Sequence, residues 1–188
     1  VLGSSFPGIQ LPSIDTDLKS ASRHAAGLLL AKGHTRIGLI RFRTKLAGDD
    51  FALEGINDAI QAYEQAHSTN VPYPIVIGHN FHSENLTTTL DRAYSSSTPP
   101  TALISVNDHH LVTAYTHLMN RGLRIPDDVS LISLTANPQF KNFQPMPTHY
   151  SCGSQHVQAI VKHLAHPSPN FTKLILPEIV HGKTVASR

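Results

Sequence analysis

The chain has 188 residues, of which 40% are hydrophobic, and this is enough to build a well-buried core. No apolar run approaches the roughly 18 residues that a membrane helix needs, and the N-terminal segment VLGSSFPG lacks the basic start and apolar stretch of a signal peptide, so we expect no membrane association. A formal net charge of +2 without a block of Lys and Arg argues against direct nucleic-acid binding, and the single cysteine, Cys152, excludes an internal disulfide and fits a cytoplasmic protein.

The first predicted elements are a helix over residues 17–32 and a buried strand over residues 36–42. Apolar residues recur three and four positions apart in the helix, Asp15 or Thr16 is expected to cap its start, and Gly33 is expected just past its end. The segment RIGLIRF that follows is short and mostly apolar, as is typical of a strand buried on both faces.

The same alternation of a helix and a strand returns three times. Helices are predicted over residues 50–66, 83–95 and 109–121, and the strands that follow them over residues 75–79, 101–108 and 129–134. Ser83 is expected to cap the second of these helices, and Gly122 to end the third. Strands separated by single helices need right-handed crossovers, which place the strands parallel. We therefore predict the α/β fold class, with a doubly wound parallel sheet flanked by helices.

The last part of the chain is less regular. The Pro-rich stretch NPQFKNFQPMPTHYS after residue 136 is too irregular for another crossover unit. A helix is predicted over residues 154–166, and KLILPEIVHGKTV predicts a terminal strand interrupted by Pro177. The apolar residues on the inner face of that helix are Val157, Ile160, Val161 and Leu164.

Ligands of open parallel sheets bind at the carboxyl ends of the strands, so the residues at those ends are the candidate site. Asn107 and Asp108 close the strand over residues 101–108. The amide of Asn107 offers both a donor and an acceptor to a sugar hydroxyl, whereas the Asp108 carboxylate could cap the next helix. We favour ligand contact for Asn107 and capping for Asp108. Gly48 lies where a helix begins, and free N–H groups there would meet an oxygen-rich ligand.

A metal site and an enzyme active site are the two alternatives to this ligand site. His79 with His82, and the adjacent His109 and His110, raise the possibility of a metal site. Neighbouring residues on a helix point about 100° apart, and no H-E-x-x-H motif is present, so we favour solvated histidines without metal or cofactor. We also predict that the chain is not an enzyme, because it has no G-x-S-x-G motif and no Gly-rich phosphate loop after a strand.

Three segments, in this order, resemble the effector domain of the LacI/GalR family of transcriptional regulators: SIDTDLKSASRHAAGLLLAKGHTRIGLI, TALISVNDHHLVTAYTHLMNRGLRIPDDVSLISL and LILPEIVHGKTV. The most telling motifs are the GH-x-R-I-x-L-I join at residues 33–40, the Asn107-Asp108 pair and the block RGLRIPDDVSLIS at residues 121–133. The resemblance covers nearly the whole chain. It implies a periplasmic-binding-protein-like type I fold, in which two lobes clasp a small ligand behind a helix-turn-helix headpiece.

The resemblance also implies how the chain is divided. Residues 14–148 and 171–185 would form the C-terminal lobe, and residues 1–13 and 149–170 would be remnants of the N-terminal lobe. The headpiece and most of the N-terminal lobe are expected to lie outside this sequence. The helix over residues 154–166 would then lack the sheet that it covers, so we expect its apolar face to dock elsewhere or to pair with a second chain.

The family pattern adds further site residues. Phe81 aligns where an aromatic ring often stacks on a sugar, although it could equally be core, and Thr135 and Ser151 occupy the remaining positions that face the cleft. Three departures weaken the sugar clamp: Ala52 replaces a usual Arg, Thr135 an acidic residue, and Ser151 a Gln or Arg. The ligand therefore differs from a simple hexose or pentose, or binding has drifted or been lost.

The resulting prediction is the effector-sensing and dimerisation part of a LacI-type regulator. It would bind a small molecule, a sugar or sugar derivative, and act as a homodimer that reaches operator DNA only through the headpiece. The alternative is the sugar-binding protein of a transport system, which shares the two-lobed architecture. An interaction module is a third possibility if side chains close the cleft. The sequence upstream of Val1 would separate the first two.

Overall fold

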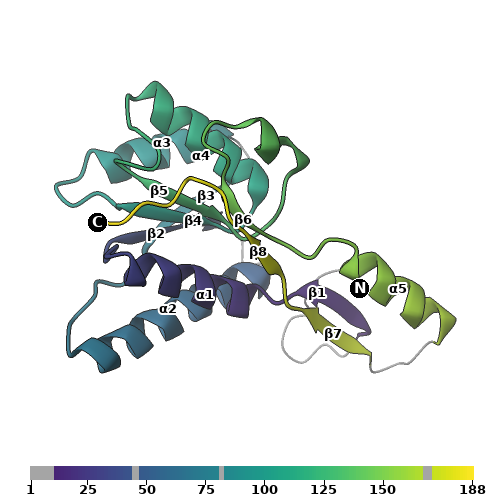
Figure 1. Ribbon diagram of the computed structural model, residues 1–188. Helices are drawn as coiled ribbons and strands as arrows, with labels where there is room; N and C mark the ends of the chain where they lie inside the picture. Colours follow the sequence, from purple (N-terminus) through teal and green to yellow (C-terminus); the bar gives the residue numbers. More distant parts are fainter. Residues whose placement is uncertain (1–10, 44–46, 81–82, 167–170) are drawn as a thin grey trace.

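A computed structural model describes residues 11–43, 47–80, 83–166 and 171–188 of the chain. Their strands form a six-stranded sheet and a separate two-stranded sheet. In Figure 1, α1 (Leu18–Ala31) and α2 (Ala47–His67) lie on one face of the larger sheet, and α3 (Ser83–Tyr94) and α4 (Asp108–Asn120) lie on the other. The predicted doubly wound α/β fold is confirmed.

The larger sheet has the strand order β3-β2-β4-β5-β6-β8. Its strands are β2 (Ile37–Phe42), β3 (Ile75–His79), β4 (Ala102–Ser105), β5 (Ser130–Ser133), β6 (Thr148–Ser151) and β8 (Glu178–Val180). All pairs are parallel except β6 with β8. Because β3 and β4 lie on opposite sides of β2, the strand order switches direction at β2, and a ligand crevice is expected at the carboxyl ends near this point.

The strands are apolar on both sides because helices cover both faces of the sheet. Leu39 and Ile104 belong to the core under α1 and α2, whereas their neighbours Ile40 and Leu103 belong to the core under α3 and α4. All four side chains are fully buried. Alternate residues of a strand point to opposite faces, so a continuous apolar run fills two separate cores.

The ends of α1 differ in part from the prediction. Asp17 caps the start, since its Oδ1 accepts a hydrogen bond from the Ser20 backbone N–H at 2.9 Å, so Asp15 and Thr16 are not the cap. Gly33 follows the end with a φ of +87°, a conformation that glycine adopts without strain and that the sequence predicted there.

A close crossing joins α1 to α2 at Gly55. A Cβ atom at this position would come within 2.2 Å of both the Lys19 carbonyl oxygen and the Ser22 Oγ. Only a residue without a side chain therefore allows the two helix backbones to approach this closely.

The Pro-rich stretch contains structure that the sequence analysis missed. A 3-10 helix spans Pro138–Asn142, and β6 then pairs in parallel with β5 and in antiparallel fashion with β8. With only four residues, β6 carries a weak local signal, and its partners lie far away in sequence. Tertiary pairing therefore determines this strand.

The predicted terminal strand is divided between two sheets. β7 (Thr172–Ile175) pairs in parallel with β1 (Ser13–Thr16), whereas β8 lies after Pro177 in the larger sheet. Proline cannot donate to a ladder and often marks such a break. In Figure 1 the β1 and β7 pair projects to one side of the larger sheet together with α5 (Gln155–Ala165). We call β1, β7 and α5 the small unit.

The apolar face of α5 is only partly covered. Ala159 packs with Ile14 and Ile175 of the small unit, with Ile160 against them, but Val157, Val161 and Leu164 are 62%, 60% and 71% exposed. These three side chains therefore do not dock elsewhere on the described part of this chain. Pairing with a second chain stays a prediction.

None of the helices in the described part of the chain is both long enough and apolar enough to cross a bilayer.

Candidate functional site

The parallel strands of the larger sheet end at one edge, and the predicted site residues lie along it. Gly48 follows β2, Asn107 follows β4, Thr135 follows β5, and Ser151 is the last residue of β6. These strands are consecutive neighbours in the sheet, so the structure brings four of the five predicted residues to the same side. We call this side the carboxyl edge. Phe81, the fifth predicted residue, and its neighbour His82 lie outside the described residues.

Asn107 lies at the switch point of the sheet and begins α4. It holds the N-cap position with an extended backbone, and its side chain makes no capping hydrogen bond to the helix. Its carbonyl oxygen accepts hydrogen bonds from the Leu111 N–H at 3.2 Å and from the Ser105 hydroxyl at 2.7 Å. The backbone of Asn107 is thus held by two bonds while its half-buried amide is not engaged by the helix, as a ligand-contacting side chain requires.

Asp108 is not the cap that the sequence predicted. It lies inside the first turn of α4, and its Oδ2 accepts a hydrogen bond from the Asn137 Nδ2 at 2.6 Å. Asn137 in turn caps the 3-10 helix through its Oδ1, which accepts from the Gln139 N–H. The carboxylate therefore links the segments that follow β4 and β5, and this contact spans 29 residues of sequence.

Thr135 and Ser151 are half-buried and both make local hydrogen bonds. The Thr135 hydroxyl donates to the Val106 carbonyl at 3.3 Å, directly beside Asn107. The Ser151 Oγ accepts from the Gly153 N–H at 3.1 Å. The Thr135 oxygen keeps a free acceptor lone pair, and the Ser151 O–H can still donate, so both can serve a hydroxyl-bearing ligand.

The start of α2 brings a buried acid to the same edge, which the sequence analysis did not single out. Asp49 is 2% exposed, and its Oδ2 accepts a hydrogen bond from the Phe42 N–H at 3.1 Å. Burial raises the pKa of this carboxyl to about 6. Gly48 is packed closely as well, since a Cβ atom there would lie 2.9 Å from the Leu18 Cδ1.

Ala52, where an Arg was expected in sugar-binding members of the family, is fully buried. It lies in the core under α1 and α2. An alanine of this kind contributes packing and no hydrogen bond, so no clamp for hydroxyl groups comes from this position.

Two histidines of the carboxyl edge are buried rather than solvated, so that part of the prediction is wrong. His79 is 1% exposed and His110 is half-buried, and their ring centroids lie 4.0 Å apart beside Phe42. His79 Nδ1 donates to the Asn80 carbonyl, which leaves its Nε2 as a buried acceptor without a partner among the described residues. Burial lowers the pKa of both rings, that of His110 to about 4.

The described residues contain no group of three His, Cys, Asp or Glu side chains that could hold a metal ion. Because burial lowers both pKa values, the edge-to-face pair of histidines forms a neutral wall of the carboxyl edge. The sequence could not show this pairing, because His79 ends β3 and His110 begins α4, and only the sheet brings the two together.

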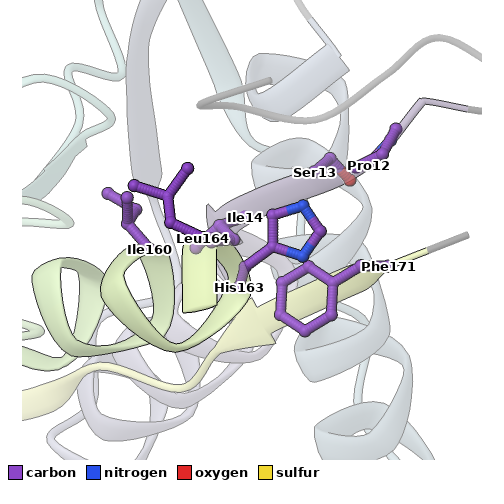
Figure 2. A pocket seen from close by; sticks show the side chains of 7 residues that line it. All are labelled: Pro12, Ser13, Ile14, Ile160, His163, Leu164 and Phe171. Carbon is purple, nitrogen blue, oxygen red and sulfur yellow. The ribbon is translucent and has the colours of Figure 1, made fainter. Parts of the chain in front are cut away.

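The small unit has a hollow of its own. This pocket has a volume of about 160 Å³ and lies between β1 and α5 (Figure 2). The His163 ring stacks on Phe171 at a centroid distance of 4.5 Å. The rest of its lining consists of Pro12, Ser13, Ile14, Ile160 and Leu164. The imidazole and Ser13 are the polar residues of its lining, so it offers few of the convergent polar groups that fix a small ligand, and the carboxyl edge is the better candidate.

Comparisons with known proteins agree with this architecture. Residues 26–185 match the family model of the periplasmic binding protein-like domain. The chain is 27% identical to the ribose operon repressor of Haemophilus influenzae over 81% of this chain and 46% of the repressor. It is also 27% identical to the transcriptional repressor PurR of the same species, over 94% of this chain and 55% of that protein. The chain thus spans about half the length of these curated relatives.

Solved structures extend the similarity to three dimensions. A LacI family transcriptional regulator from Enterococcus faecium with bound ribose superposes with a TM-score of 0.81 at 18% identity, over 100% of this chain and 70% of that one. A dimeric Lac repressor gives a TM-score of 0.83 at 18% identity, over 100% and 68%. At this identity the superpositions establish the shared fold.

Proposed function

Because the chain belongs to the periplasmic binding protein-like domain family, as an effector-binding domain of the LacI/GalR type, we propose that it senses a small molecule for a transcriptional regulator. The observation that carries the proposal is the position of Asn107. Its amide lies at the switch point of the sheet without a capping bond, beside the hydroxyl of Thr135. Crevices at such points are where open α/β sheets bind ligands.

The proposed effector is a sugar or a sugar derivative. The carboxyl edge offers the Asn107 amide and the hydroxyls of Thr135 and Ser151, which are neutral groups that suit ligand hydroxyls. One structural neighbour was solved with ribose, which supports this class of ligand. Since Ala52 provides no guanidinium, recognition here depends on neutral hydrogen bonds, and the ligand differs from those held by an arginine clamp.

The proposed mechanism is a population shift between two lobes. We assign the larger sheet to one lobe and the small unit to the other, with the carboxyl edge between them. The sequence predicted residues 14–148 and 171–185 for the first lobe. We propose instead that residues 13–16 and 172–175 belong to the second lobe, because β1 pairs with β7 outside the larger sheet. A ligand that contacts both lobes favours their closed arrangement.

The whole regulator is proposed to act as a homodimer. Two-fold symmetric regulators match palindromic operators, and the DNA-contacting headpiece would lie in a part of the protein that these residues do not cover. The curated relatives named above are repressors rather than enzymes or transport proteins, which favours a regulator over the sugar-binding component of a transporter.

The test is calorimetric titration of the full-length protein with D-ribose, then with a panel of pentoses, hexoses and nucleosides. For the ligand that binds, Asn107→Ala is expected to weaken the affinity at least tenfold, about 1.4 kcal/mol, because a ligand hydroxyl loses both amide partners.

Asn120→Ala is the matched control, since Asn120 is an exposed residue at the other end of α4. It should change the affinity less than twofold. The site proposal fails if the two variants bind alike, and the sensing proposal fails if no member of the panel binds.

A further inference from the structure

Strand β3 forms one border of the larger sheet, and no described segment pairs with its outer side. It follows two prolines, Pro72 and Pro74, and its five residues IVIGH are mostly apolar. A strand edge of this kind presents unpaired backbone N–H and C=O groups, to which an extended segment of another protein can be added.

One hydrogen bond shows which backbone N–H and C=O groups of β3 face β2 and which face the outer side. The His79 carbonyl accepts from the Arg43 N–H at 2.9 Å, so it faces β2. Because backbone groups alternate along a strand, those of Val76 and Gly78 face the outer side. On this side the Arg43 Nε donates to the Gly78 carbonyl at 3.1 Å, whereas the N–H and C=O of Val76 and the Gly78 N–H have no partner among the described residues.

The side chains of β3 also leave one apolar position uncovered. Ile77 is buried under α3, and Ile75 packs against the same core, whereas Val76 points to the opposite face and is 43% exposed. An added strand that carried apolar residues at alternate positions would cover Val76.

A groove of about 320 Å³ runs beside β3 toward α3. Arg43 and Arg92 both line it and both are exposed, while its lining includes no acidic residue. The Arg43 side chain lies across Gly78, where a Cβ atom would come within 3.0 Å of its Cγ, so glycine at this position makes room for the guanidinium.

We propose that the outer side of β3 and this groove bind an extended acidic segment of a partner protein, which adds to the sheet as a seventh strand. Backbone hydrogen bonds to Val76 and Gly78 hold the segment, and its carboxylates meet Arg43 and Arg92. A second copy of this chain is disfavoured as the partner, because a two-fold pairing of β3 with itself would bring four arginine side chains together without an acid.

The test uses two labelled heptapeptides with blocked ends, one in which glutamate and valine alternate and one in which lysine and valine alternate. Fluorescence anisotropy is measured with the 188-residue chain. We expect saturable binding of the glutamate peptide and at least tenfold weaker binding of the lysine peptide. Equal binding of the two peptides, or no binding of either at millimolar chain concentration, would overturn the proposal.

Two variants separate strand addition from simple charge attraction. Val76→Pro removes the outward N–H, and Arg92→Glu reverses one charge of the groove; each is expected to weaken binding of the glutamate peptide at least tenfold. Arg23→Glu, an exposed position on α1, is the control with the same charge change and should alter binding less than twofold.

Amide hydrogen exchange of the unmodified chain gives a readout that does not depend on the folding of any variant. Bound glutamate peptide should slow exchange at Val76 and Gly78 and leave α1 unchanged. If the peptide binds without this protection, or if inorganic phosphate displaces it fully, the groove is an anion site and strand addition is wrong.

Discussion

The larger sheet and the small unit are both built from strands and helices, but they differ in how completely helices cover their strands. Two helices cover each face of the larger sheet, and Leu39, Ile40, Leu103 and Ile104 are fully buried between them. In the small unit α5 is the one helix on the described strand pair, and apolar side chains remain exposed on α5 and β7. Secondary structure therefore forms in both parts, but most of the hydrophobic stabilisation lies in the larger sheet.

The strongest test of this difference compares two truncations. Ile104→Ala removes a fully buried side chain and should lower the free energy of unfolding by about 3–4 kcal/mol, because it leaves a cavity that the layers cannot close. Val161→Ala on α5 should lower it by less than about 0.5 kcal/mol, since that side chain is 60% exposed. Urea denaturation measures both values, and similar losses would show that the small unit is covered in solution.

A second test concerns the close crossing of α1 and α2. Gly55→Ala should destabilise the fold by about 1–3 kcal/mol, because the new Cβ would strike the Lys19 carbonyl. Gly27→Ala is its control, since nothing lies within 4 Å of a Cβ there, and it should stabilise α1 by about 0.5–1 kcal/mol. Thermal unfolding measures both changes in stability, which should have opposite signs. If Gly55→Ala left the stability unchanged, the close approach of α1 and α2 at Gly55 would be contradicted.

A third test uses the histidine wall of the larger sheet. His110 has a folded pKa of about 4, below its unfolded value of about 6.5, so protonation favours the unfolded chain and stability falls as the pH drops from 6.5 toward 4. His110→Leu removes this dependence. The variant should gain about 1–2 kcal/mol relative to the original chain between pH 7 and pH 4.5, measured by denaturant titration at each pH. Parallel pH profiles for the two chains would refute the burial of this ring.

The fourth test concerns Asp49, whose folded pKa of about 6 lies above its unfolded value, so stability falls as the pH rises from about 4 through 6. Asp49→Asn keeps the bond from the Phe42 N–H and should raise stability at pH 7 by about 1 kcal/mol, with the gain vanishing near pH 4.

Asp50→Asn is the matched control for this residue. It breaks the exposed ion pair with Arg41 and should instead cost about 0.2–1 kcal/mol at pH 7. A loss of stability for both variants would contradict the buried, destabilised carboxylate at position 49.

Much of the fold could be predicted from local patterns. The run RIGLIRF predicted a strand buried on both faces, and β2 is buried over its first four residues between two cores. The glycine after α1 was likewise readable from its position. These predictions succeed because each depends on the spacing and backbone preferences of residues only a few positions apart.

The candidate site was predictable in location but less so in detail. The strand-end rule selected Asn107 and the family resemblance added Thr135, and neighbouring strands bring the two residues to one edge. The sequence predicted a capping role for Asp108, because its contact with the distant Asn137 is visible only in the folded chain. Asp49 was not predicted, because its burial depends on the packing of α2 against β2.

The sequence by itself thus determined the alternation of helices and buried strands, and with it the parallel sheet and its carboxyl edge. The tertiary structure decided which strand joins which sheet: β6 forms between β5 and β8, and the segment after residue 171 divides at Pro177 to pair with β1 on one side and β6 on the other. Short strands carry little intrinsic preference, so their pairing follows from hydrogen bonds and apolar contacts that become available only when distant segments meet.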